Sequence, residues 1–236
     1  MSITADADTG GGTEMKNGRM VFALIACACV ALVAACGARA LKVARADAPL
    51  SPLMPTTTST TDGGAALTAE EEALNLRPLK LPLAEPRVVV EKGARRLRLY
   101  AGGELVRVRR VALGFEPSGD KVKQGDGRTP EGDFYVCMKN DKSKFYLSLG
   151  LNYPNEEDAE RGLRDGLITK ATAASIVRAN RAGRCPAWNT ALGGEIFIHG
   201  GGTASDWTLG CVALENPEIK ELFDNIPTGT PVSIKP

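Results

Sequence analysis

Two residues near the C-terminal end of the sequence are of the right types for acyl transfer. His199 is the only histidine among 236 residues, so any imidazole chemistry must use it. Cys211 follows twelve positions later (211 − 199). A free thiol has a pKa of about 8.5, and pairing with an imidazole can lower it, so that thiolate is present near neutral pH. The imidazole can also supply the proton that a departing amine needs. The pair is therefore chemically sufficient to break and re-form an amide bond.

Glycines surround this pair. They are Gly200, Gly201, Gly202 and Gly210. Glycine adopts backbone angles that other residues avoid and lets a substrate approach the main chain closely. An exposed turn with free N–H groups could also stabilise an oxyanion. Composition and spacing alone leave a second interpretation open, because a lone cysteine is often a small buried hydrophobe.

The remaining cysteines do not predict a metal site. They are Cys27, Cys29, Cys36, Cys137 and Cys185. Since no C-x-x-C pair is present, a zinc site has little support, and we expect neither a metal nor an organic cofactor. In an oxidising compartment Cys137 and Cys185 could pair as a disulfide and leave Cys211 free, although the sequence does not give their separation in space. The formal net charge of +1 argues against a dedicated nucleic-acid binder.

The first 46 residues have the composition of an export leader. Residues 21–38 are almost wholly apolar, and Lys16 and Arg19 precede them. Such an opening is typical of a secretory signal or an N-terminal anchor helix. Three fates stay open: cleavage after residues 44–46, lipidation of Cys36 as in a lipoprotein, or retention as a membrane anchor. Each of them predicts an exported protein of the periplasm or cell envelope.

Residues 47–86 are expected to be a flexible linker. The stretch up to about residue 66 is rich in Pro, Ser, Thr and Gly and cannot bury enough apolar area to offset its chain entropy. Thr68 and Glu71 are spaced as a capping box, which predicts a short helix ending near Leu76. Residues 77–86 contain three prolines and are expected to run extended to the edge of a domain.

Residues 87–236 are expected to form one mainly β, α+β domain. Strand patterns occur at 88–90, 97–99, 105–113, 134–138, 145–149, 196–199 and 231–234. Helical patterns occur at 156–162, 169–182 and 218–223. The long segment from Tyr153 to Gly194 comes just before the strand that carries His199. Because a connection of this length is usually functional, we expect it to cap the active-site cleft.

The residues around the pair resemble the active-site motif of the L,D-transpeptidase catalytic domain of the YkuD type. That motif is His-Gly, a variable loop, then Ser/Thr-x-Gly-Cys and an aliphatic residue, and here it matches His199-Gly200 and residues 208–212. Upstream, residues 125–132 (GDGRTPEG) resemble the family's G-D-x-x-T-P-x-G turn, and residues 97–114 resemble its opening hairpins. The likeness covers residues 87–236 in the expected order.

This resemblance implies a β-sandwich or barrel fold and a two-step reaction on peptidoglycan stem peptides. Cys211 would attack the amide between the L-centre of the third residue and the fourth residue, D-Ala, and form a thioester. An amine of a second stem would then resolve the thioester to a 3→3 cross-link, with His199 as proton donor and acceptor. The expected partners are stem peptides, and membrane contact would come through the leader.

Further site residues are expected around the pair. We expect a carbonyl near Gly200 to orient the imidazole, because no second histidine is present, and Thr208 to hydrogen-bond near the sulfur. Gly210 completes the predicted catalytic set. Gly201 and Gly202 are expected to border the substrate. Trp207 either walls the substrate groove or packs internally.

Two positions depart from the family pattern and leave the direction of the reaction open. Many members carry His directly before Gly-Cys and Arg two positions after Cys, where this chain has Leu209 and Ala213. The variant resembles a subgroup with murein hydrolase-like members, so an L,D-carboxypeptidase and a hydrolase of cross-links or lipoprotein linkages stay alternatives. Papain-like amidases generally place Cys before His, which argues against them. A non-catalytic wall-binding envelope protein is the alternative of another class.

Overall fold

The computed structural model describes residues 64–236. The predicted leader of residues 1–46, with its possible cleavage, lipidation and anchoring sites, and the first part of the predicted linker lie outside the described residues. Between residues 64 and 236, no helix is both long enough and apolar enough to cross a membrane.

The described part of the chain consists of eight strands and four helices. In chain order they are α1 (Ala69–Leu76), β1 (Arg87–Glu91), β2 (Arg96–Ala101), β3 (Glu104–Arg110), β4 (Gly132–Ser143), β5 (Tyr146–Leu151), α2 (Glu156–Arg164), α3 (Lys170–Arg181), β6 (Phe197–His199), β7 (Val212–Ala213), α4 (Asn216–Asn225) and β8 (Pro231–Lys235). The predicted mainly β, α+β class is confirmed.

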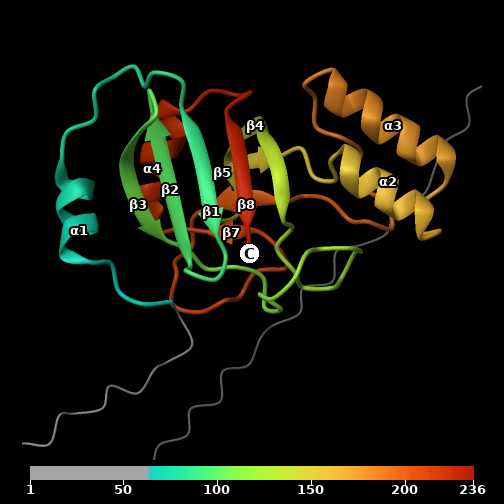
Figure 1. Cartoon of the computed structure of the whole chain (residues 1–236), viewed down its shortest axis with the longest axis horizontal. Coiled ribbons are helices and arrows are strands. Elements are labelled where there is room, and N and C mark those ends of the chain that lie inside the picture. Colours follow the sequence, from blue (N-terminus) through green and yellow to red (C-terminus); the bar gives the residue numbers. More distant parts are fainter. Residues whose placement is uncertain (1–63) are drawn as a thin grey trace, which may run out of the picture. The chain divides into compact units, whose positions relative to one another are not determined.

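The strands form one mixed sheet in the order β3-β2-β1-β8-β4-β5-β6-β7 (Figure 1). The long strand β4 joins two halves of it. Residues 132–135 of β4 pair with β8, whereas residues from Val136 onward pair with β5. Two pairs in the sheet are parallel, β1 with β8 and β6 with β7. Strand β4 thus connects the half that starts with the N-terminal hairpins to the half that carries His199 and Cys211.

The segment that follows β3 runs alongside the opposite edge of the sheet. The N–H of Ala112 donates to the Ala213 carbonyl at 3.0 Å, and the Ala213 N–H donates back at 2.8 Å. Two residues further on, the Thr208 N–H donates to the carbonyl of Leu113 at 3.0 Å. These bonds join the chain next to the first edge strand, β3, to the last one, β7. The sheet is therefore curled, as the expected sandwich or barrel requires.

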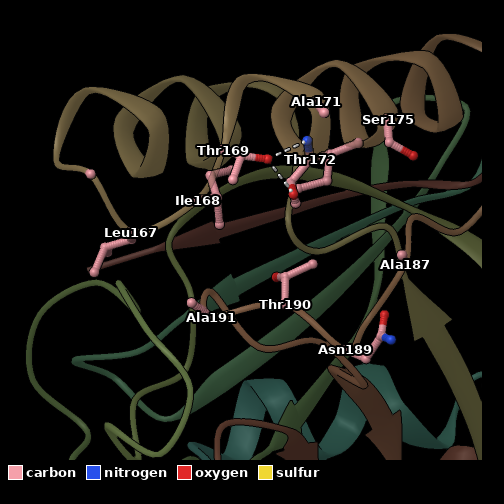
Figure 2. A pocket seen from close by; sticks show the side chains of 12 residues that line it. Leu167, Ile168, Thr169, Ala171, Thr172, Ser175, Ala187, Asn189, Thr190 and Ala191 are labelled. Atoms are coloured by element: carbon pink, nitrogen blue, oxygen red, sulfur yellow. Dashed lines mark hydrogen bonds between the residues drawn. The ribbon is translucent and has the colours of Figure 1, made fainter.

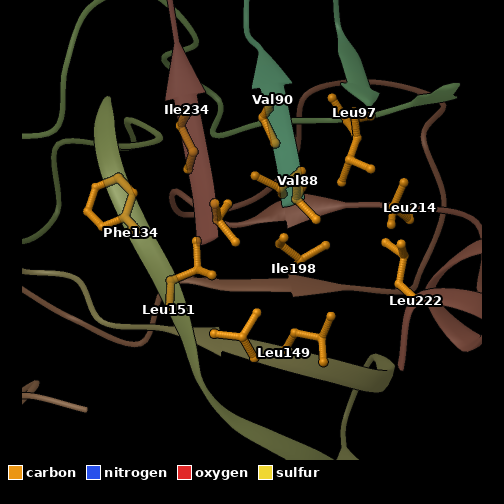
Figure 3. Packing of buried hydrophobic residues seen from close by; sticks show 14 of the residues in the cluster. Val88, Val90, Leu97, Phe134, Leu149, Leu151, Ile198, Leu214, Leu222 and Ile234 are labelled. Carbon is orange, nitrogen blue, oxygen red and sulfur yellow. The ribbon is translucent and has the colours of Figure 1, made fainter. Parts of the chain in front are cut away.

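One large apolar cluster fills the inside of the curled sheet (Figure 3). Its members come from both halves: Val88 and Val90 on β1, Leu149 and Leu151 on β5, and Ile198 on β6. Each of these five side chains is fully buried. Burial of such side chains stabilises the folded state by roughly 25 cal/mol for each Å² of apolar area removed from water. The strand that carries His199 is thus fixed on its inner face by Ile198.

Helix α1 begins with the predicted capping box. The Glu71 N–H donates to the Thr68 hydroxyl, and the Glu71 carboxylate accepts the Thr68 N–H. At the other end the Asn75 side chain bonds both the N–H and the carbonyl of Val108 on β3. This short helix is therefore attached to the edge strand of the sheet.

Helices α2 and α3 belong to an insertion between β5 and β6 with a small core of its own. That core consists of Ala159, Ile168, Ala173, Ile176 and Leu192. A disulfide between Cys137 on β4 and Cys185 after α3, with Cα atoms 5.2 Å apart, ties the insertion to the sheet. The pairing of these two cysteines, which the sequence left open, is thereby settled, and Cys211 is free.

A groove of about 650 Å³ lies within the insertion (Figure 2). It runs between the start of α3, where Thr169 caps the helix, and the returning segment that contains Asn189 and Thr190. Its lining includes neither His199 nor Cys211. This groove is therefore separate from the residues predicted to do the chemistry.

Candidate active site

His199 and Cys211 lie on neighbouring parallel strands. His199 ends β6 and is paired with Ala213 of β7. Cys211 comes directly before β7, two residues ahead of Ala213. Since side chains alternate along a strand and paired residues point to the same side, Cys211 and His199 lie on the same face of the sheet, diagonally across two strands. The core residues Ile198 and Val212 point to the opposite face.

The sulfur of Cys211 has two backbone contacts. The Phe197 N–H donates to Sγ at 3.4 Å, and the thiol is 3.4 Å from the carbonyl oxygen of Glu195, to which it donates. Burial raises the pKa of Cys211 to about 11, and the Glu195 carboxylate adds to the rise, whereas the Phe197 N–H and the charge of Lys121 act in the opposite sense. In this resting arrangement Cys211 is therefore a neutral thiol.

The imidazole of His199 is oriented by the carbonyl of the next residue. Its Nδ1 lies 2.6 Å from the Gly200 oxygen, which can only accept, so Nδ1 carries the hydrogen and Nε2 of the neutral ring has the free lone pair. A carbonyl near Gly200 was expected to take this part, and the contact is present. Only 2% of His199 is exposed, and burial lowers its pKa, against a smaller opposing effect of the Gly200 carbonyl.

These pKa directions differ from the simplest expectation for the pair. A resting thiolate–imidazolium pair would have a lowered cysteine pKa and a raised histidine pKa, and the reverse is found for both. The two side chains do not hydrogen-bond to each other either, since both thiol contacts are to backbone atoms. The arrangement is suited to a neutral imidazole that takes the thiol proton as attack begins.

Thr208 and Gly210 shape the turn before the nucleophile. The Thr208 hydroxyl donates to the Cys211 carbonyl at 2.8 Å and accepts the Gly210 N–H at 3.1 Å. Thr208 therefore contacts the backbone of Cys211, whereas it was expected near the sulfur. Gly210 has a φ of +130°, and a Cβ there would lie 2.6 Å from the Arg128 carbonyl oxygen. Its N–H is occupied by Thr208, so Gly210 serves the close approach of two backbone segments.

Residues 125–132 (GDGRTPEG) form a hydrogen-bonded loop that packs against this turn. Asp126 accepts hydrogen bonds from the N–H groups of Val122, Lys123 and Arg128. The buried hydroxyl of Thr129 accepts the Gly114 N–H at 2.9 Å, and it is 3.5 Å from the Cys211 carbonyl. The motif quoted from the sequence therefore supports the backbone of the nucleophile rather than its sulfur.

Asp206 anchors the loop between His199 and Cys211. Its carboxylate pairs with Arg95 in the turn between β1 and β2, with Nη2 2.7 Å from Oδ2, and accepts the Leu113 N–H at 2.8 Å. Both ionic side chains are mostly buried, at 17% and 12% exposed. A partly buried, bidentate pair of this kind orders a loop more strongly than a surface ion pair does.

The glycine run after His199 is bound to the start of α4. The Gly201 N–H donates to the Asn216 side-chain oxygen at 3.0 Å, and the Gly202 N–H donates to the Leu214 carbonyl at 2.9 Å. A Cβ at Gly200 would lie 2.4 Å from the same Asn216 oxygen. Gly201 and Gly202 have φ angles of +110° and +99°. The absence of side chains is thus required for the turn itself.

Aromatic side chains surround the imidazole. The Phe145 ring stacks on His199 with centroids 4.6 Å apart, and Trp207 meets both rings edge-on. Trp207 is 37% exposed and its Nε1–H donates to the Gly202 carbonyl. Trp207 therefore packs beside the imidazole and keeps part of its surface exposed, and its role as a wall of the substrate groove stays a prediction.

The insertion contacts the nucleophile through its returning segment. Glu195, whose carbonyl contacts the thiol, has a φ of +54°, which is uncommon outside glycine. The helices themselves are bound further away, where Arg161 of α2 pairs with Asp120 and Tyr135 of β4 donates to the Asn180 carbonyl of α3.

Comparison with known protein families gives a match over most of the described chain. The model of the L,D-transpeptidase catalytic domain, YkuD, matches residues 85–234, more than half of the sequence. The chain belongs to this family. The family expected from the sequence motifs is thereby confirmed, and the match begins close to the first strand, β1, and ends within β8.

Several solved structures resemble this YkuD domain at low identity. An L,D-transpeptidase from Xylanimonas cellulosilytica is 19% identical over 67% of this chain and 64% of its own, with a TM-score of 0.39. Bd1075 from Bdellovibrio bacteriovorus is 22% identical over 64% and 48%, with a TM-score of 0.43. The helical cell shape determining protein Pgp2 from Campylobacter jejuni is 19% identical over 69% and 52%, also at 0.43.

These figures set the extent of the likeness. The chain spans between about half and two thirds of the length of the three solved chains. No protein with a curated function matches it in sequence.

Several residues that shape the site were not found by sequence reasoning. Phe145 gave no signal beyond opening a predicted strand. Asp206 was visible next to Trp207, but its partner Arg95 is 111 positions away, and nothing local announces that pairing. Thr129 was within a quoted family motif, which could have marked it as a support for the catalytic turn.

Proposed function

We propose that this protein is a peptidoglycan L,D-transpeptidase that uses Cys211 as nucleophile and His199 as general base and acid. One observation carries the proposal. The only histidine and the only free cysteine of the described residues lie on the same face of adjacent strands, in a chain of the YkuD family. The orientation of His199 through Nδ1 supports it further, because Nε2 is left with its lone pair.

The proposed reaction starts from a neutral pair. As Sγ attacks the amide carbon between the L-centre of the third residue and D-Ala, Nε2 of His199 takes the thiol proton. Collapse of the tetrahedral intermediate forms the thioester and breaks the C–N bond, and the protonated imidazole gives its proton to the departing D-Ala amine. An amine of a second stem then attacks the thioester and gives a proton to His199, which passes it to the departing sulfur, so that the C–S bond breaks, the thiol is restored and a 3→3 cross-link is left.

The cell envelope is the proposed location. Its support is the Cys137–Cys185 disulfide, which is typical of proteins that fold in oxidising compartments, together with the predicted leader of residues 1–46. Each of the three predicted fates of that leader, which are cleavage, lipidation at Cys36 and retention as an anchor, is consistent with this location.

The test is product analysis with purified protein and disaccharide-tetrapeptide. We expect D-Ala release and cross-linked dimers by mass spectrometry, and neither product from Cys211→Ala or from His199→Gln. Circular dichroism and melting curves should show that both variants are folded. D-Ala release without dimers would favour the carboxypeptidase. Cleavage of supplied cross-links would favour the hydrolase, the alternative that the departures at Leu209 and Ala213 leave open. Undiminished release by Cys211→Ala would contradict the mechanism.

A further inference from the structure

The environment of His199 contains a feature that the proposed chemistry does not by itself require. Phe145 lies flat on the imidazole, with an interplanar angle of 23° and ring centroids 4.6 Å apart. Trp207 stands at 63° to the imidazole, with centroids 5.5 Å apart, and at 61° to Phe145, with centroids 5.3 Å apart. The three rings therefore form one packed group.

The rings shield the imidazole from water. His199 is 2% exposed, whereas Phe145 is 44% and Trp207 is 37% exposed. Here their inner faces cover the imidazole and their outer faces are open to solvent.

Both aromatic residues are also bonded to the backbone that orients His199. The Gly200 N–H donates to the Phe145 carbonyl at 3.1 Å, while the Gly200 carbonyl contacts Nδ1 of His199. On the other side, Nε1–H of Trp207 donates to the Gly202 carbonyl at 3.1 Å. The turn at Phe145 and the loop at Trp207 thus hold the backbone on either side of the Gly200 carbonyl that contacts the ring.

We infer that Phe145 and Trp207 are positioning residues, an aromatic clamp that fixes the plane of the His199 imidazole and keeps it out of water, so that it waits as a neutral base. This inference rests on the proposed function for its catalytic meaning. Its structural part, the control of the imidazole by two rings, holds whatever the substrate is.

The charge surroundings of His199 agree with the clamp. Burial is the main cause that lowers the pKa of His199, and no charged side chain of residues 64–236 contributes to the shift. The titratable neighbour on the same sheet face is Cys211, which is neutral at rest. Glu215 of the adjacent loop is engaged with Thr203. Removal of a shielding ring should therefore act on His199 through water access.

Because the chain has one histidine, nuclear magnetic resonance reads this clamp directly. A sample labelled at histidine is titrated for wild type, Phe145→Ala, Phe145→Tyr and Tyr146→Leu. Tyr146 is the matched control, an adjacent aromatic residue that is 45% exposed and lies outside the ring cluster. We expect a pKa below 6.5 in wild type, a return toward 6.5 in Phe145→Ala with loss of the ring-current shift on the imidazole protons, and wild-type behaviour in the other two.

The activity readout is separate. With disaccharide-tetrapeptide at pH 7, Phe145→Ala should lower kcat by about tenfold or more with a smaller change in KM. Phe145→Tyr, which keeps an aromatic ring at this position, should have a kcat close to that of the wild type. An unchanged His199 titration and unchanged ring-proton shifts in folded Phe145→Ala would overturn the clamp, even in an active enzyme. If wild type lacks activity but the titrations behave as expected, the proposed function fails and the clamp stands.

Discussion

The sheet and the helical insertion are built in different ways. The sheet encloses twenty buried apolar residues, and two of them, Ile198 and Val212, are the inner-face neighbours of His199 and Cys211. The insertion has a separate cluster of five such residues, and its ties to the rest of the domain include the Cys137–Cys185 disulfide, the pairing of Arg161 with Asp120 and the bond from Tyr135 to the Asn180 carbonyl. The comparison teaches that the reacting residues share the main core, whereas the insertion is an attachment that reaches them with one carbonyl, that of Glu195.

A matched pair of core substitutions tests this contrast with the largest expected effect on stability. Ile198 on β6 and Ile176 on α3 have the same side chain and are both buried, at 0% and 1% exposed. We expect Ile198→Ala to lower the free energy of unfolding by about 4–5 kcal/mol and Ile176→Ala by about 2 kcal/mol, because the small core can collapse around its cavity. Urea denaturation measures both. Equal losses, or a larger loss at Ile176, would show that the insertion is as integral as the sheet.

Removal of the disulfide should come next in size. In the double variant Cys137→Ser with Cys185→Ser, we expect a loss of about 2–4 kcal/mol in the free energy of unfolding, since a loop with a sequence separation of 48 is released in the unfolded chain. The reaction rate should fall far less than in Cys211→Ala, because the contacts of His199 lie within the sheet and its loops. A double variant that is stable but inactive would mean that the insertion takes part in the chemistry.

The pH dependence of stability sharpens the contrast with the smallest effect. Burial raises the pKa of Asp158 in α2 to about 7, above its value of 3.8 in an unfolded chain. The folded state therefore binds more protons between about pH 4 and 7, so wild type should lose stability as pH rises through that window. Relative to Asp158→Asn, which cannot ionise, we expect a loss of about 1–3 kcal/mol by chemical denaturation across this range. A relative gain for wild type would show that pairing with Arg161 outweighs burial.

Most of the sheet could be predicted because its strands have strong local patterns. The run Val88–Val90 is apolar throughout, and it forms β1 within the sheet. Strand β7 could not be predicted, because Val212–Ala213 is a strand only through its pairing with β6 and with Ala112. Strand β4 runs on to Ser143, well past the predicted end at residue 138, because the polar residues there are held by pairing with β5 rather than by their own preference.

The residues of the site likewise divide into those that the sequence predicted and those that only the structure identified. The types and spacing of His199 and Cys211, with a family motif around them, were legible in sequence. The contacts that fix their protonation states were not, because they depend on burial and on partners far along the chain. The stacking of Phe145 on His199 joins residues 54 positions apart (199 − 145), and no periodicity reports such a pairing.

The most direct test of the account is to trap the intermediate on the protein. Wild type is mixed with disaccharide-tetrapeptide, quenched in acid and digested, and the peptide that contains Cys211 is weighed by mass spectrometry. We predict an added mass equal to the substrate less D-Ala, bound as a thioester that hydroxylamine removes, and no addition in Cys211→Ala. Product formation by Cys211→Ala, or an adduct on any other residue of an active wild-type sample, would contradict the central claim that this sulfur carries the acyl group.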